Sequence, residues 1–328
     1  KGYDSDVLTQ LAIDWLEKER SKDKRFFLYL SFKAPHYPFQ PAPRHKGRYA
    51  DKKIPYPETF ARTERNYRTQ PKWVAERRYS IHGVDHMETG PFDNDPVPNF
   101  DDFYHSYAEA VHSIDENVGK LMDYLDRSKL SGKTLVIYMG DNGFHLGEHG
   151  FYDKRDAFEP SMRVPLLAWA PGTLKGGTKV EKLVQNIDIA PSILAAAGVE
   201  APASAKFDGM SWLPLAQGKT LGEGQWRDHV LYEYHWEWNF PATPTMLAIR
   251  TERYKYVYYH GTWDIDSFHD LKNDPIERHN LIDVPDHQER IAELRAKLFK
   301  AFEESGGLNL PLRAPAGDRL DQRKIPLK

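Results

Sequence analysis

Helical and strand-like segments alternate along the chain as far as Gly209, and this alternation restricts the fold more than any single motif does. Some segments repeat apolar residues at helical spacing, and continuous apolar runs of strand length follow them. The predicted order is helix 8–16, strand 26–32, helix 107–125, strand 134–139, strand 164–169 and helix 187–197. Short buried strands that alternate with helices are typical of an α/β sheet with helices on both faces.

The pattern changes after Gly209, where short aromatic runs are separated by turn residues. These runs lie at residues 228–234, 245–250 and 254–259. They predict a small antiparallel sheet, and the periodicity of residues 286–304 predicts a final helix beside it. We therefore divide the chain into an α/β part at residues 1–209 and a small C-terminal α+β subdomain with a tail at residues 210–328.

Composition and charge exclude several classes of partner. The chain has 45 basic and 48 acidic residues, interspersed along its length, so no basic face that would bind nucleic acid is predicted. It contains no cysteine, which excludes a disulfide scaffold, a thiolate zinc site and a cysteine nucleophile among these residues. No apolar run approaches the roughly 18 residues that cross a bilayer, so no membrane span is predicted.

A glycine-rich segment directly after the predicted strand 134–139 carries many ionisable residues. Asp141 and Asn142 offer a carboxylate and an amide oxygen, hard ligands suited to Ca²⁺ or Mg²⁺, at the edge where ligands bind in open α/β sheets. With Gly143 they could instead form an Asx turn that only closes the strand. The ionisable residues that follow are His145, His149, Lys154, Arg155, Glu159 and Arg163. Such a concentration of charge predicts convergence on a ligand.

A second candidate, His36, follows the predicted strand 26–32 and stands between two prolines. A histidine at this edge of the sheet can donate to an anionic oxygen or protonate a leaving group. The alternative is a histidine that only makes structural hydrogen bonds. His36 also lies near the start of residues 34–102, a long segment with little periodicity that predicts a functional or insertion loop.

Several short blocks, taken in order, resemble one protein family. The blocks are residues 34–36, 107–125, 140–150, 154–155, 163–166, 186–191, 208–209 and 253–256. They resemble the type I sulfatases of the alkaline-phosphatase-like superfamily, and most of all the bacterial N-acetylglucosamine-6-sulfatases and mucin-desulfating sulfatases. The resemblance extends from the first residue to about residue 282. It implies a partial alkaline-phosphatase-like sheet, with residues 1–209 forming the C-terminal part of the catalytic domain.

The resemblance also implies roles for individual residues. Asp141 and Asn142 would be calcium ligands, and His36 and Lys154 would be catalytic residues that contact the sulfate. A cation and a lysine would neutralise charge on the sulfuryl oxygens, while His36 or Lys154 would stabilise or protonate the departing sugar oxygen. The weaker candidates are substrate-binding residues, with the two histidines at the rim of the pocket: His145, His149 and Arg155.

The implied activity is the hydrolysis of a sulfuric ester on a sulfated sugar or glycan, with formylglycine as nucleophile. Family members work in a periplasmic, secreted or lysosome-like compartment. Two alternatives stay open: a phosphonate or phosphate monoester hydrolase of the same superfamily, and a non-catalytic module that binds anionic glycan. The aromatic residues of segment 232–238 suit a sugar-binding surface, although a strand buried against the main domain explains them equally well.

The chain departs from the family at its most diagnostic motif. The signature is Cys or Ser followed by x-Pro-x-Arg, whose first residue becomes formylglycine, and no such sequence occurs among the 328 residues. By the same comparison, two more calcium-binding aspartates would precede Lys1. We therefore expect a fragment that is inactive alone and binds calcium weakly or not at all. We also expect its truncated sheet to expose an apolar edge or face through which it can self-associate.

Overall fold

The computed structural model describes residues 2–89, 99–262 and 264–307. The chain forms two compact units. The helical unit consists of Lys1–Pro55, Pro98–Leu135 and Ala170–Gly172, and the sheet unit consists of Tyr56–Val97, Val136–Trp169 and Thr173–Lys328. These units do not follow the division at residue 209, which stays a prediction, and its tail at residues 308–328 lies outside the described residues.

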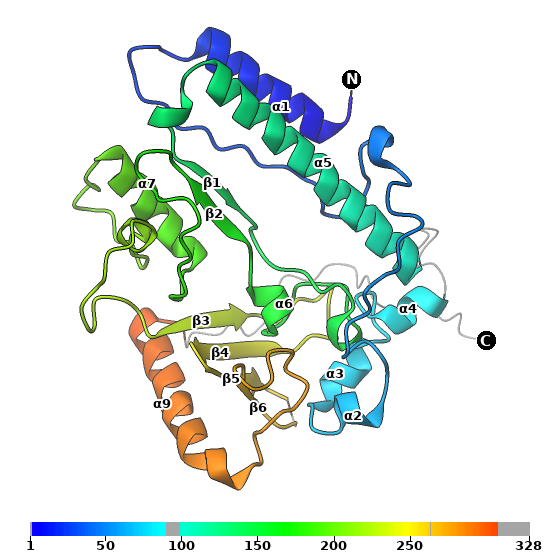
Figure 1. Ribbon diagram of the computed structural model, residues 1–328. Helices are drawn as coiled ribbons and strands as arrows, with labels where there is room; N and C mark the ends of the chain where they lie inside the picture. Colours follow the sequence, from blue (N-terminus) through cyan, green and yellow to red (C-terminus); the bar gives the residue numbers. More distant parts are fainter. Residues whose placement is uncertain (1, 90–98, 263, 308–328) are drawn as a thin grey trace. The chain divides into compact units, whose positions relative to one another are not determined.

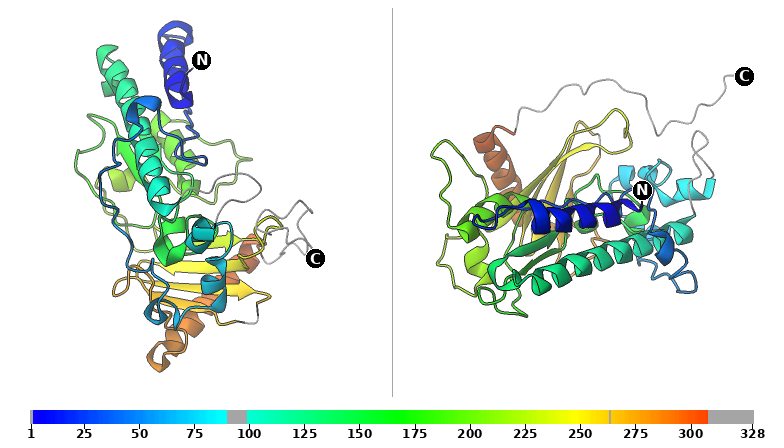
Figure 2. Two further views of the ribbon diagram at one scale, coloured as in Figure 1. Left: turned by 90° about the vertical axis from the view of Figure 1, so that its right-hand side faces the viewer. Right: turned by 90° about the horizontal axis from the view of Figure 1, so that it is seen from above.

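The helical unit is built on the pair α1 (Asp4–Asp14) and α5 (Phe100–Arg127), which lie side by side in Figures 1 and 2. A π-helical turn, Trp15–Glu19, follows α1, and Asn99 caps α5 by accepting the amide of Asp102 at 2.8 Å. Large apolar residues such as Phe103 and Ile114 are buried on α5. Other buried positions of both helices carry small or polar side chains at helical spacing, which permits close approach. These positions are Ser5, Thr9 and Ala12 on α1, and Ala110, Ser113 and Asn117 on α5.

The prediction of a buried strand at residues 26–32 is wrong for the described chain. This segment is not assigned to any strand, although partly buried and exposed positions alternate along it with the period of an extended chain. Phe27 is 67% exposed and Tyr29 is 81% exposed. An apolar run shows that a strand is favourable, but the strand forms only where a neighbour supplies the hydrogen bonds.

The sheet unit begins with a two-stranded antiparallel ladder of β1 (Val136–Met139) and β2 (Leu166–Trp169). Both strands lie where the apolar runs predicted them. Between them in sequence is the short helix α6 (Glu159–Met162), and after them come α7 (Ile189–Ala197) and α8 (Leu213–Ala216). The predicted end of α7 is confirmed, because Gly198 adopts a left-handed conformation with φ of 62°.

A four-stranded antiparallel sheet completes this unit and confirms the small antiparallel sheet predicted after Gly209, although its fourth strand was not predicted. The strands follow in the order β3 (His229–Tyr234), β4 (Thr245–Thr251), β5 (Tyr254–His260) and β6 (Ser267–Asp270). Helix α9 (Gln288–Ser305) lies along one face, as Figure 1 shows. The core on that face is formed by Leu247, Ile249, Tyr256 and Phe268 with Ile291, Leu294, Leu298 and Phe302.

The opposite face of this sheet is also buried, which explains why β4 is a continuous apolar run. Met246 and Ala248 point to this second core, whereas Leu247 and Ile249 point to α9. The second core is completed by residues from the segment predicted to be irregular, chiefly Trp73 and Val74. That segment forms the short helices α2 (Glu64–Tyr67), α3 (Lys72–Arg77) and α4 (Val84–Thr89), and its residues 90–98 lie outside the described residues.

The mixed α/β class predicted from the alternating pattern is confirmed. Within the described ranges, none of the helices combines the length and apolar character that a membrane crossing requires.

Candidate active site

The turn that follows β1 presents two oxygen-bearing side chains to solvent. Asp141 and Asn142 are both exposed, and the backbone amide of Asn142 donates to Asp141 Oδ1 at 2.9 Å. The next residue, Gly143, is buried, and its amide donates to the carbonyl of Ser161 at 2.9 Å. A Cβ at this position would lie 2.1 Å from the carbonyl oxygen of Pro160, so the turn requires glycine. The turn is therefore fastened to α6 immediately after its two polar side chains.

The donor atoms of this turn fit a hard cation. Asn142 Nδ2 donates to the carbonyl of Gly143 at 2.8 Å, which leaves the amide oxygen as the atom that can bind a metal. The carbonyl of Asp141 is held by Asn186 Nδ2 at 2.8 Å, so its carboxylate extends from a fixed backbone. Across the described residues, no group of three or more His, Cys, Asp or Glu side chains could hold a metal ion. Asp141 and Asn142 thus fit part of an oxygen-ligand site.

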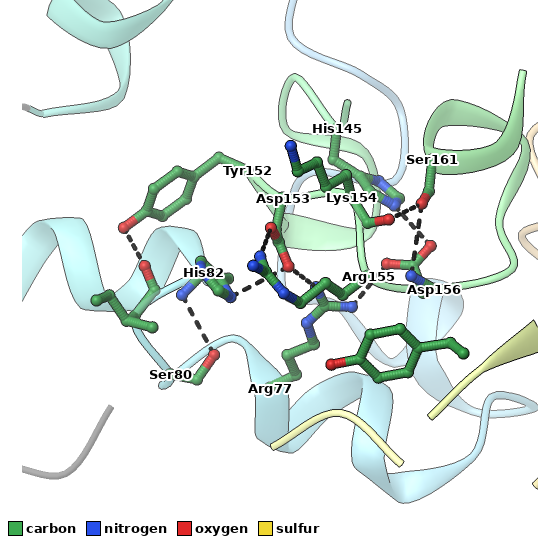
Figure 3. A network of polar contacts seen from close by, with 12 residues as sticks. Arg77, Ser80, His82, His145, Tyr152, Asp153, Lys154, Arg155, Asp156 and Ser161 are labelled. Atoms are coloured by element: carbon green, nitrogen blue, oxygen red, sulfur yellow. Dashed lines mark hydrogen bonds and ion pairs between the residues drawn. The ribbon is translucent and has the colours of Figure 1, made fainter. Parts of the chain in front are cut away.

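A buried ionic network surrounds the segment that carries Lys154 (Figure 3). Arg77, the last residue of α3, is fully buried and donates through Nη2 to Asp153 Oδ2 at 2.5 Å and through Nη1 to Asp156 Oδ2 at 2.6 Å. His82 Nδ1 lies 3.1 Å from Asp153 Oδ2. The two carboxylates, three positions apart in sequence, therefore share one guanidinium group in the interior.

The favourable electrostatic free energy of these ion pairs exceeds the desolvation free energy of the two buried carboxylates. Burial alone would raise the pKa of Asp153, but His82, Arg77 and Arg155 hold it below its usual range. Burial likewise opposes ionisation of Asp156, yet His145, Arg77 and the amide of Phe158 lower its pKa to about 2. Burial lowers the pKa of His82. The network is thus stable with both carboxylates charged and paired.

Lys154 and Arg155 are adjacent in sequence but differ in their contacts. Arg155 donates through Nη1 to Asp153 Oδ1 at 2.8 Å and through Nε to Glu237 Oε1 at 3.0 Å. Its guanidinium carbon lies 3.6 Å from the centre of the Phe240 ring. Lys154 is half-buried. Within the described part of the chain its ammonium group makes no hydrogen bond or ion pair, and in Figure 3 no dashed line reaches this nitrogen. Of these two cations, Lys154 is therefore the one that is available to a ligand.

The prediction that His145 and His149 line the substrate rim disagrees with their positions. His145 is fully buried, and its Nε2 lies 2.9 Å from Asp156 Oδ1. His149 is also buried and stacks on Phe158 with 3.9 Å between ring centres, and burial holds its pKa well below the usual value. Side chains without accessible surface cannot contact a substrate in this conformation. Both histidines instead contact buried residues of the same loop, Asp156 and Phe158.

His36 belongs to the helical unit and is described apart from the residues above. It is exposed in a tight turn in which its amide donates to the carbonyl of Lys33 at 3.0 Å and its carbonyl accepts the amide of Phe39 at 3.1 Å. Its Nδ1 lies 3.2 Å from the carbonyl of Tyr37. The sheet unit brings together the other candidates on one continuous loop, with Asp141, Asn142 and Lys154 accessible and Arg155 engaged.

Several residues that shape the site were not predicted. Arg77 is separated from its carboxylates by 76 and 79 positions, so no local pattern pointed to it. The acids themselves flank Lys154 and Arg155, and this charge pattern was the only signal that could have been used. The block at residues 186–191 has a structural explanation: Asp188 is buried, pairs with Arg227 and accepts the amide of Met210 at 2.8 Å.

Comparison with known proteins gives consistent results. The sequence matches the Sulfatase family model over residues 1–199 and the model described as N-sulphoglucosamine sulphohydrolase, C-terminal, over residues 147–304. It is 27% identical over 342 aligned residues to the N-acetylglucosamine-6-O-sulfatase of Bacteroides thetaiotaomicron. This match covers 90% of the chain and 60% of that protein.

Two further proteins show the same relationship. The chain is 30% identical over 251 aligned residues to the human N-acetylglucosamine-6-sulfatase, covering 75% of the chain and 42% of that protein. It is also similar to a solved protein in complex with its substrate D-glucosamine-2-N,6-O-disulfate. That similarity has a TM-score of 0.83 at 25% identity and covers 96% of the chain and 72% of the other. The chain thus spans 42% to 60% of the length of these two curated relatives.

The buried network predicts a specific loss of stability in acid. Asp156 has a pKa of about 2 when folded, below its ordinary value of 3.8, so it stabilises the fold above pH 3.8 and loses this contribution as the pH falls toward 2. We expect Asp156→Asn to reduce the free energy of unfolding at pH 5, and the difference from the wild type to narrow by about 2 kcal/mol near pH 2. Urea unfolding across this pH range measures the difference.

The control is Asp283→Asn, which alters an exposed carboxylate of the same unit. Its difference from the wild type is expected to stay small throughout the range. A constant difference between the wild type and Asp156→Asn at every pH would show that the carboxylate is not the group responsible.

Proposed function

The chain belongs to the sulfatase family, and from this premise we propose that it is part of an enzyme that removes sulfate from a sulfated sugar or glycan. The N-acetylglucosamine-6-O-sulfatase of Bacteroides thetaiotaomicron aligns with 90% of the chain, and the bound substrate of one similar protein is a sulfated glucosamine. A 6-O-sulfated amino sugar is therefore the proposed substrate. The observation that carries the proposal is the presence of Asp141, Asn142 and Lys154 on one loop, with the ammonium group of Lys154 unpaired among the described residues.

Calcium is the proposed metal, held in part by Asp141 and Asn142. Both ligand atoms are hard oxygens on an exposed turn, and Gly143 fixes the turn to α6. When bound, a divalent cation would supply positive charge to the sulfuryl oxygens. The family also uses formylglycine, which the 328 residues do not encode because the required motif is absent. The nucleophile is proposed to come from a part of the protein outside this sequence.

Lys154 is proposed to bind the sulfate and to stabilise the leaving oxygen. Its ammonium group is not engaged by any described residue, whereas Arg155 is neutralised by Asp153 and Glu237. An unpaired cation interacts most strongly with charge that develops as the S–O bond breaks. His36 is the proposed proton donor to the departing sugar oxygen, because it is exposed and its turn orients the ring through Tyr37.

Arg155 is proposed to act on the substrate indirectly. It connects the Lys154 segment to Glu237 and Phe240, which lie in the aromatic segment that follows β3. Such a segment can contact the sugar ring. The compartment follows from the family alone, and we propose a periplasmic, secreted or lysosome-like location.

The difference between Lys154 and Arg155 is the basis of the main test. In the complete gene product we expect Lys154→Ala to lower kcat by about 10²–10³-fold on a sulfated aryl ester. Arg155→Ala should lower kcat by less than about tenfold, because Arg155 contributes through packing and ion pairs. Steady-state kinetics on both variants, with equal folding and equal formylglycine content, measure the two losses. If the two losses of kcat differ by less than a factor of about three, the difference in activation free energy is under 1 kcal/mol. Lys154 would then contribute only as one of several positive charges near the substrate.

The 328-residue chain alone provides a second test. Asp141 and Asn142 supply few of the roughly 6–8 oxygens that calcium prefers, so we expect weak or undetectable calcium binding by calorimetry and no appreciable sulfate release. Asp141→Ala should remove any residual heat of binding. Tight calcium binding by the wild-type chain would mean that other residues of this sequence complete the site.

We also propose that this chain self-associates through residues 26–32. Phe27 and Tyr29 are 67% and 81% exposed on an extended segment without an assigned ladder, which is a typical aggregation edge. Sedimentation velocity should show association that rises with concentration, and Phe27→Ser with Tyr29→Ser should reduce it. The matched control is Leu11→Ser, which changes an exposed apolar residue on α1. A monodisperse wild-type monomer would contradict the proposal.

A further inference from the structure

We propose that Arg77 is a positioning residue for Lys154, and that it acts by holding the backbone on both sides of this lysine. The inference rests on the proposed function, in which Lys154 contacts sulfate. Arg77 is remote in sequence and lies at the end of α3, where it is fully buried and has no path to a substrate. Any effect it has on turnover must therefore pass through the residues that it binds.

The geometry of the contact fixes a short stretch of chain. One planar guanidinium binds Asp153 through Nη2 and Asp156 through Nη1, at 2.5 and 2.6 Å (Figure 3). Because the two nitrogens have a fixed separation, the two carboxylates cannot move independently while both bonds are made. Lys154 and Arg155 are the two residues between these carboxylates. The backbone that carries Lys154 is thus held at both ends by one rigid group.

Backbone contacts complete this support. The carbonyl of Asp153 accepts the amide of His145 at 2.8 Å, and the carbonyl of Lys154 accepts the hydroxyl of Ser161. Asp156 Oδ1 also accepts the amide of Phe158 at 3.1 Å. The carbonyls of Asp153 and Lys154 are therefore bonded within the protein, while the ammonium group of Lys154 makes no hydrogen bond or ion pair with the described residues. A functional side chain on a rigid, internally bonded segment is held close to one geometry.

A purely structural role for Arg77 is the alternative, since a buried cation with two anionic partners would also stabilise the fold. The two roles differ in one respect. A stabilising residue changes turnover by the same factor whether or not Lys154 is present, whereas a positioning residue has nothing left to position once Lys154 is removed. A double-mutant cycle between the two residues separates these cases.

The test uses Arg77→Lys in the complete gene product, alone and combined with Lys154→Ala. Lysine keeps the charge but is a point donor that cannot bind both carboxylates in the same fixed geometry. We expect Arg77→Lys to lower kcat by about 10- to 100-fold in the wild-type background. In the Lys154→Ala background the same change should lower kcat by less than about twofold. Equal factors in both backgrounds would overturn the proposal.

Arg78→Lys is the matched control. Arg78 is the adjacent residue, is also buried and pairs with a carboxylate, Asp85, at 2.6 Å, but it does not contact Asp153 or Asp156. It should lower the midpoint of thermal unfolding to an extent similar to Arg77→Lys and lower kcat by less than about threefold. An equal loss of kcat in both variants at equal stability would also overturn the proposal.

Two further measurements cover the remaining outcomes. If Arg77→Lys does not fold, Asp153→Asn removes the ion pair between Arg77 and Asp153 with an isosteric side chain. This variant then replaces Arg77→Lys in the double-mutant cycle with Lys154→Ala. If the wild-type protein releases no sulfate, the proposed function is wrong. A crystal structure of the Arg77→Lys protein still tests whether Arg77 holds the backbone at Asp153 and Asp156. Displacement of the backbone at residues 153–156 supports the positioning role, and an unchanged backbone overturns it.

Discussion

The bond between one buried arginine and two buried aspartates organises the loop on which the candidate site stands. Arg77 has no accessible surface, and leaving it unpaired in the interior would cost several kcal/mol. Asp153 and Asp156 must therefore stay close to it, and the chain between them can follow few paths. His145 adds a further contact to Asp156 at 2.9 Å. The half-buried position of Lys154 is a consequence of these buried contacts.

A second buried ionic cluster, formed by Lys255, Glu159 and Glu277, supports the helix α6 that follows this loop. Lys255 on β5 is fully buried, and its Nζ lies 3.1 Å from Glu159 Oε1 and 2.6 Å from Glu277 Oε1. Glu159 is the first residue of α6, whose carbonyl at Ser161 accepts the amide of Gly143. The turn with Asp141 and Asn142 is thus connected through α6 to the four-stranded sheet. The C-terminal sheet therefore supports the loop, and the candidate site residues of the sheet unit come from the segment after β1.

Local patterns predicted the elements well where each element depends on its own residues. Helices α5 and α9 were predicted from residue spacing, and the end of α7 was predicted from Gly198, which can adopt positive φ. The buried face of α5 also carries polar residues such as Ser113 and Asn117, which apolar spacing does not reveal. The aromatic runs predicted β3, β4 and β5 at the correct positions, whereas β6 was not predicted. The run at residues 26–32 failed because apolar character does not reveal whether a neighbouring strand is present to pair with it.

The sequence by itself determined the family, the turn with Asp141 and Asn142, and the two adjacent cations beside it. These follow from neighbours in the chain, such as the glycine that the turn requires. Only the tertiary structure decided which cation is free. Lys154 and Arg155 have the same charge and the same local surroundings, and they differ because Asp153 and Glu237 approach one of them through the fold. Burial of His145 was also decided this way, since accessibility depends on residues that are distant in sequence and close in space.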